Sequence, residues 1–162
     1  MSAAPRRRRL TGGLRVALPP AEAFRLFTPY GEREWVEGWE PRFPEGVADD
    51  TAPGTVFQTG ADGAATTWIV LHRAHDPHEP GSSVSYARVR EGVHAGTVGV
   101  VLAPDGSGHS DVTVTYDLTP LTVAAEAELA GFADGYPAFL RSWEEAIAAH
   151  LARTAETPRG HR

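Results

Sequence analysis

Two stretches of the sequence gather side chains that could do chemistry. The first, GEREWVEGWEPRFP at residues 31–44, places four glutamates around Trp35 and Trp39. Carboxylates held close together can act as general acid and general base. The second, HRAHDPHE at residues 72–79, contains three histidines and two carboxylates, which are donors that a zinc site uses. Each chemical interpretation depends on whether the spacing brings the side chains together.

The spacing of the first stretch favours a structural role. In a helix, residues 35 and 39 lie about 40° apart, so the two indoles would share one face. Each indole buries roughly 150–250 Å², while glutamates such as Glu34 and Glu37 would point to solvent. The stretch therefore predicts a short helix that lays its tryptophans over something apolar, like a lid, and not a pair of catalytic carboxylates.

The histidine-rich stretch predicts an exposed polar hairpin. Pro77 and Pro80 exclude a helix there, because proline lacks the N–H that a helix interior needs. The histidines would then follow a strand end into a turn, whereas zinc requires three or four convergent ligands with supporting contacts. No metal site is predicted.

The composition removes several kinds of catalysis. The chain has no cysteine and no lysine, and all 15 of its basic residues are arginine. Disulfides, thiolate zinc sites, cysteine nucleophiles, Schiff bases and phosphate-binding P-loops are therefore excluded. The sequence also lacks the G-x-S-x-G pattern of serine hydrolases. No cofactor is predicted.

The charge argues against a nucleic-acid partner, since the net charge is −6 and such proteins normally carry a basic surface. The one basic run, RRRR at Arg6–Arg9, is interpreted as part of a disordered tail over residues 1–9. No signal peptide and no membrane span are predicted, because no apolar stretch is long enough. The chain is expected to be cytoplasmic, a monomer or a homodimer, with a frayed tail at residues 154–162.

The order of the predicted elements indicates an α+β fold. A strand at residues 10–18 is followed by two short helices, one at residues 20–27 and one in the tryptophan stretch. From residue 54 the pattern alternates with period two in five segments, separated by Gly, Pro, Asp and Ser, as in an antiparallel meander. The segments are GTVFQTG, ATTWIVLHRA, SSVSYARVRE, AGTVGVVLAP and SDVTVTYDLTP. In the last one, apolar residues alternate with Asp and Thr, so one face of the sheet is expected to be covered and the other wet.

A long helix is predicted over residues 122–153, from an apolar stripe at three- and four-residue spacing. Pro137 and Gly135 fall in its middle. Because proline removes one helical hydrogen bond and crowds the carbonyl of residue 133, the helix is expected to bend there. The bend either wraps the helix around a curved sheet or keeps a cavity mouth open.

Several stretches together resemble the SRPBCC superfamily, which includes START-like proteins, polyketide cyclases and Hsp90-ATPase activators. They are PPAEAFRLFT, GEREWVEGW, TTWIV, YARV, AGTVGV and YPAFLRSWEEAI. The resemblance covers about residues 10–152. The sequence is similar to bacterial members without an assigned role, and the resemblance implies one helix-grip domain at residues 10–153. It implies a curved antiparallel sheet wrapped around a long C-terminal helix, an apolar cavity between them, and two short helices at one end of that cavity.

The resemblance makes the cavity the candidate site. Its walls are expected to be formed by aromatic, aliphatic and polar residues of the two short helices, the sheet and the long helix. These candidate ligand-binding residues are Trp35, Trp39, Tyr86, Arg88, Val100, Tyr116, Phe132, Tyr136, Phe139 and Trp143.

The orientation of the polar candidates depends on the phase of one strand. If Val84 and Tyr86 point inward, Arg88 and Arg90 do as well, and a buried arginine needs an anionic or carbonyl partner: an internal glutamate or a ligand carboxylate. The opposite phase puts both arginines on the surface. For Arg88 both orientations stay open, and for Arg90 the surface is preferred.

Each candidate tyrosine is either a pocket wall or a core residue that donates to a backbone carbonyl. His94, at the start of a strand, is a weak candidate for proton transfer.

The function expected from these features is binding of a small hydrophobic or amphipathic molecule, such as a lipid, a polyketide-like compound or an aromatic metabolite. The main alternative is an enzyme similar to aromatase/cyclases, which would act on a polyketide in the same cavity. A third is a protein-interaction module like the Hsp90-ATPase activators, which would use the outer face of the sheet.

Overall fold

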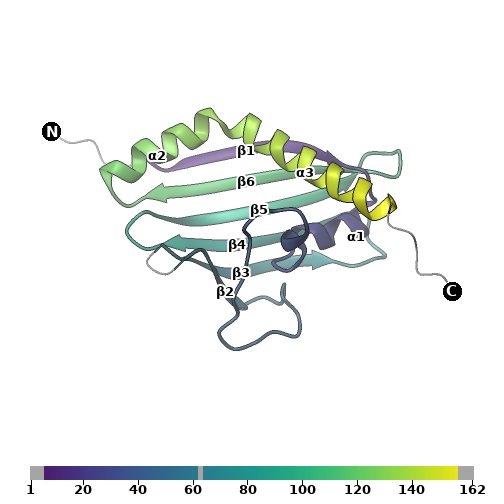
Figure 1. Ribbon diagram of the computed structural model, residues 1–162, viewed down its shortest axis with the longest axis horizontal. Coiled ribbons are helices and arrows are strands. Elements are labelled where there is room, and N and C mark those ends of the chain that lie inside the picture. The colour runs from purple at the N-terminus through teal and green to yellow at the C-terminus, as the bar shows by residue number, and fades with distance from the viewer. Residues whose placement is uncertain (1–5, 62–63, 157–162) are drawn as a thin grey trace.

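The structure, a computed structural model, describes residues 6–61 and 64–156. Six strands form one antiparallel sheet in the spatial order β1-β6-β5-β4-β3-β2 (Figure 1). They are β1 (Arg8–Val16), β2 (Val56–Thr59), β3 (Thr66–His75), β4 (Ser82–Arg90), β5 (His94–Pro104) and β6 (Ser110–Pro120). The meander predicted from the period-two pattern is confirmed, with each of its strands within two residues of the expected position.

The inner face of the sheet is apolar and the outer face is polar. On β6, Val112 and Val114 are buried, whereas Asp111 and Thr113 between them are exposed. Leu14 of β1 lies opposite Val112, which continues the buried row onto the edge strand. This alternation lets one face hold the core while the other faces water, as predicted.

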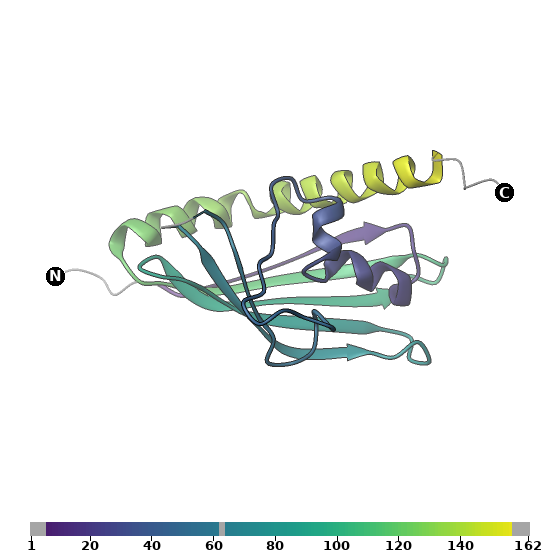
Figure 2. The same cartoon turned by 60° about the horizontal axis from the view of Figure 1, so that its bottom comes forward.

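Helices cover the inner face only (Figure 2). The C-terminal pair is α2 (Val123–Asp134) and α3 (Tyr136–Glu156), which run along the sheet as one interrupted rod. Thr122 caps α2 by accepting a hydrogen bond of 3.0 Å from the N–H of Ala125. No helix within residues 6–61 and 64–156 is long and apolar enough to cross a membrane.

The helix predicted as one bent element over residues 122–153 is instead two helices divided at Gly135. This residue ends α2, and Pro137 lies in the first turn of α3. Proline is tolerated there because the first N–H groups of a helix have no intrahelical acceptor. The proline therefore starts a new helix instead of kinking the middle of one.

The first predicted short helix forms, but in two parts: α1 (Pro20–Ala23) and the 3₁₀ turn η1 (Phe24–Phe27). It ends at Thr28, whose extended backbone suits the residue before Pro29.

The predicted tryptophan helix is wrong. Only the 3₁₀ turn η2 (Gly31–Glu34) forms in that stretch, and Trp35 leaves the helical region with φ −136°. Gly38 then turns the chain with φ +77°, a conformation that favours glycine. The two indoles consequently do not share a helix face.

The chain ends also differ from expectation. β1 begins at Arg8, inside the segment predicted to be a disordered tail, because Arg8 and Arg9 extend the ladder opposite Leu118 and Asp117 of β6. The side chain of Arg7 pairs with the Asp117 carboxylate at 2.6 Å. At the other end α3 reaches Glu156, three residues past the predicted helix end. The rest of the two predicted tails, residues 1–5 and 157–162, lies outside the described residues.

Candidate functional site

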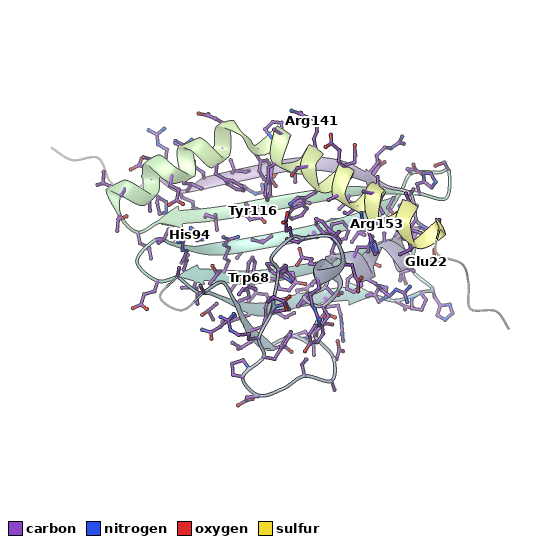
Figure 3. The ribbon with its side chains drawn as sticks, viewed as in Figure 1. Glu22, Trp68, His94, Tyr116, Arg141 and Arg153 are labelled. Carbon is purple, nitrogen blue, oxygen red and sulfur yellow. The ribbon has the colours of Figure 1, made fainter. Side chains whose placement is uncertain are left out.

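A cavity of about 210 Å³ lies between the sheet and α2. Strands β4, β5 and β6 form its floor, and α2 with the start of α3 forms its roof. Its lining residues are Arg88, Arg90, His94, Tyr116, Leu118, Ala125, Glu128, Leu129, Phe132 and Phe139. His94 and Tyr116 mark its extent along the sheet in Figure 3.

Small residues leave this space open. Ala125 of α2 is buried and reaches only a short way toward the sheet. On β5, Gly96 is the next inward position after His94, and a Cβ there would lie 2.0 Å from the Asp117 carbonyl oxygen. Because β5 and β6 approach so closely at this point, no side chain fills the space between His94 and Val98.

Aromatic rings form the apolar wall. Phe132 meets Tyr116 and Phe139 edge to face, with ring centroids 5.3 Å and 5.0 Å apart. Tyr116 and Phe139 are themselves 5.9 Å apart in the same geometry. Edge-to-face contacts of this kind favour a fixed arrangement of rings. The wall is therefore preformed and presents ring surface to the cavity.

Arg88 forms the polar part of the floor. Its Nε donates a hydrogen bond of 3.0 Å to Nε2 of His94. Its guanidinium carbon lies 4.9 Å from the ring centre of Trp68 and 5.8 Å from that of Tyr116, as in cation–π contacts. Burial lowers the pKa of Arg88, although arginine remains charged in proteins. Within the described residues, neither Nη group donates to a protein acceptor and no carboxylate forms an ion pair with Arg88.

The strand phase that the sequence left open is thus inward. Val84 and Tyr86 are buried, and alternation carries Arg88 and Arg90 to the same face, while Val89 between them is 39% exposed. The surface position preferred for Arg90 was wrong, because Arg90 is half-buried and lines the cavity.

His94 is held neutral by its surroundings. Burial, followed by the positive charges of Arg88 and Arg90, lowers its pKa to about 4. A neutral imidazole has one nitrogen that accepts a hydrogen bond, and Nε2 fills this role toward Arg88. His94 therefore fixes the guanidinium in place without adding charge to the site.

Glu32 is a site residue that the sequence analysis missed. It was grouped with the solvated glutamates, which is correct for the exposed Glu34 and Glu37 but wrong for Glu32. The residue keeps part of its surface, yet burial of its carboxyl raises its pKa well above the ordinary value, and only the charge of Arg88 opposes this rise. The carboxyl consequently lies inside the fold, within electrostatic reach of Arg88.

The neighbour of Glu32 explains this placement. A Cβ on Gly31 would lie 1.6 Å from the Arg25 carbonyl oxygen, so η2 packs directly on η1 where only glycine fits. Two features of the sequence could have indicated the placement of Glu32. One is the glycine directly before it, and the other is an inward-facing arginine that needs an anionic partner.

The three candidate tyrosines have different roles. The hydroxyl of Tyr86 donates to the Phe27 carbonyl at 3.0 Å, and that of Tyr136 donates to the Val114 carbonyl at 2.6 Å. Both are core tyrosines of the kind considered above. Tyr116 lines the cavity, its hydroxyl makes no protein hydrogen bond among the described residues, and burial raises its pKa. It is a neutral donor that remains available.

Four candidate residues lie away from the cavity. Trp35 packs against Trp143 and Phe27, with centroids 5.2 Å and 5.9 Å away. Trp39 meets Trp68 at 5.7 Å, and Val100 is buried in the centre of the sheet. None of these four tryptophan and valine candidates (Trp35, Trp39, Trp143 and Val100) lines the cavity. Trp68, which the sequence analysis did not select, packs its ring against the Arg88 guanidinium.

The histidine-rich stretch takes part in packing. His75 stacks on Phe24 with centroids 4.0 Å apart, and its Nδ1 lies 3.0 Å from the Ser82 hydroxyl. Across residues 6–61 and 64–156, no group of three or more histidine and carboxylate side chains could hold a metal ion.

Solved structures share this architecture. The MLL2253 protein from Mesorhizobium loti is 21% identical, with a TM-score of 0.59 over 91% of this chain and 98% of that chain. A Thermobifida fusca protein is 17% identical, with a TM-score of 0.64 over 95% and 99% of the two chains. Norcoclaurine synthase from Thalictrum flavum, solved with dopamine and hydroxybenzaldehyde, is 10% identical, with a TM-score of 0.58 over 96% and 91%. The chain has the Bet v1/SRPBCC-like fold.

The predicted SRPBCC-like helix-grip fold is therefore confirmed. No protein-family model matches the sequence, and no curated protein matches it. Identities this low support the shared fold alone, so the function of this SRPBCC-like chain has to be argued from its own cavity.

Proposed function

We propose that this SRPBCC-like chain binds a small amphipathic molecule, about the size of one substituted ring, in the cavity beneath α2. The observation that carries the proposal is an aromatic cavity with two kinds of polar donor, the Nη groups of Arg88 and the Tyr116 hydroxyl, that have no protein acceptor among the described residues. A preformed apolar pocket with a few convergent polar groups is the usual form of a small-molecule site.

The volume supports a single ring. The cavity measures about 210 Å³, and an apolar cavity of about 150 Å³ is enough for benzene. Pockets for larger ligands measure about 300–1,000 Å³. A ring with one substituent is therefore favoured over the lipid or folded polyketide considered from the sequence. The SRPBCC-like neighbour solved with dopamine and hydroxybenzaldehyde, two single-ring molecules, is consistent with this size class.

An enzymatic role is the second candidate, and one observation favours it. Glu32 is an enclosed carboxyl with a raised pKa, and Tyr116 is a free phenol; Arg88 interacts electrostatically with both. An acid with a raised pKa beside a hydroxyl donor could move a proton on a bound carbonyl compound. Turnover of a ring-bearing carbonyl substrate that is lost in Glu32→Gln would support this role over simple binding.

The binding proposal is tested by filling the cavity. Ala125→Leu adds three carbons at the roof, each contributing about 0.8 kcal/mol on burial, so we expect the free protein to gain about 1–2 kcal/mol of stability. Thermal unfolding is then recorded with toluene, benzyl alcohol and benzoate. A ligand at a hundred times its Kd stabilises the wild type by about 2.7 kcal/mol, and Ala125→Leu should abolish that gain.

The matched control is Ala152→Leu, which adds the same atoms at an exposed position of α3. It should leave ligand stabilisation unchanged. The proposal fails if none of the three ring compounds stabilises the wild type, or if Ala125→Leu responds to them as the wild type does.

A further inference from the structure

The charged groups around the cavity indicate which class of ring compound it takes. We propose that the ligand is a ring-shaped organic acid whose carboxylate pairs with Arg88. The inference rests on the proposed function and deepens it, because it names the chemical class of the ligand.

The first argument is the state of the Arg88 guanidinium. Arg88 is half-buried and lines the cavity, yet it has no ion pair among the described residues, and a cation withdrawn from water is favoured by a counter-ion. His94 occupies its Nε, and Trp68 and Tyr116 lie against its face. Both Nη groups are left for the cavity. A planar pair of N–H donors matches the two oxygens of a carboxylate.

The second argument is that His94 holds the guanidinium without competing for the anion. Its Nε2 accepts from Arg88, and its other nitrogen carries the proton of a neutral ring. The burial that excludes its protonated form also strengthens any charge–charge contact made at the site. The floor is thus preorganised for a negative charge that the protein itself does not place there.

Two ligands of the same shape test the ligand class. Calorimetric titration of the wild type with benzoate and with benzamide should give at least a tenfold lower Kd for benzoate. Arg88→Gln should remove that preference, whereas Arg141→Gln, on the exposed outer side of α3 (Figure 3), should keep it. Arg88→Lys keeps the charge without the paired donors, and serves if Arg88→Gln fails to fold; it should lower the preference.

The outcomes separate the two proposals. If benzoate and benzamide bind equally well, the inference of an acid ligand is overturned while the proposed function stands. If neither ring compound binds or stabilises the wild type, the proposed function is overturned, and the inference that rests on it is overturned as well.

Discussion

The two halves of the space between the sheet and its helices have walls of the same residue types but are packed differently. In the filled half, around Trp35 and Trp39, large rings meet one another: Trp35 contacts Trp143, and Trp39 contacts Trp68 and Phe57. Beneath α2, rings line a cavity of about 210 Å³ instead. An aromatic composition is therefore shared by a filled half and a hollow half of one fold.

Polar groups distinguish the two halves better than rings do. In the filled half three indole N–H groups have protein acceptors: the Leu26 carbonyl for Trp35, the Pro29 carbonyl for Trp39 and the Thr59 hydroxyl for Trp68. In the hollow half the Nη groups of Arg88 and the hydroxyl of Tyr116 lack such acceptors among the described residues. Because buried polar groups are normally paired, unpaired donors beside a cavity mark the half that is suited to a ligand.

The largest expected effect would come from emptying the filled half. Trp35→Ala removes a fully packed indole and its 2.7 Å hydrogen bond to the Leu26 carbonyl. Large-to-small changes in such cores cost roughly 3–5 kcal/mol, so urea unfolding should show a loss in that range. Binding of benzoate should stay at the wild-type affinity, since Trp35 does not line the cavity.

Phe132→Ala is the matched change in the hollow half. Phe132 is half-buried and already faces open space, so its loss should cost at most about 2 kcal/mol while altering which ring compounds bind. Equal stability losses for the two variants, or lost binding in Trp35→Ala alone, would contradict the division into a filled and a hollow half.

A second prediction concerns the pH dependence that Glu32 gives to stability. Its carboxyl titrates near the ordinary value in the unfolded chain and well above it in the folded protein. The stability contributed by neutral Glu32 is therefore complete below the unfolded pKa and is lost as the pH rises through the folded pKa. Each pH unit between the two values corresponds to about 1.4 kcal/mol.

Glu32→Gln should remove this loss, so the variant should become more stable than the wild type as the pH rises. Chemical unfolding of both proteins at several pH values measures the difference, in which the opposite contribution of His94, lost as the pH falls toward 4, cancels. Glu34→Gln is the exposed control. A constant difference between Glu32→Gln and the wild type would mean that Glu32 is solvated in the folded protein.

The sheet and the C-terminal helices were predictable because their patterns are local. Alternation on β6 and the three- and four-residue stripe around Phe139 depend only on which face is buried. That the long helix would not run straight through Gly135 and Pro137 followed from backbone chemistry, although a bend was predicted and the structure has a break. The tryptophan stretch was not predictable in this way, since its path is set by contacts with distant carbonyls, at Leu26 and Pro29.

The site was predictable only in part, for the same reason. Phe132 and Phe139 came from the helical stripe, and Arg88 came from a strand whose two phases were equally consistent with the sequence. The buried Val84 and Tyr86 decide between these phases. Which half is hollow depends on the small side chain of Ala125 and on the close approach of β5 and β6 at Gly96. Neither residue belongs to a sequence pattern that predicts a cavity.

The smallest expected effect is at the junction of the two halves, where α2 meets α3. An interior proline costs about 3 kcal/mol relative to alanine, but Pro137 lies in the first turn of α3, where its missing N–H is not needed. Pro137→Ala should therefore destabilise the protein by less than about 1 kcal/mol, because alanine gives the unfolded chain more conformational freedom than proline does. Ala148→Pro, at an exposed position inside α3, is the contrasting control and should cost about 3 kcal/mol or more.

The same variant tests whether the junction controls access to the cavity. With alanine at position 137, α2 can continue into α3 without the ring that now separates them, and a straighter helix would hold the roof closer to the sheet. Stopped-flow mixing with benzoate, followed by tryptophan fluorescence from Trp68 beneath Arg88, should then give a slower association rate at a nearly unchanged Kd. An unchanged rate in Pro137→Ala would leave the junction as a bend that fits the helix to the curved sheet, and the opening of the hollow half would have to lie elsewhere along α2.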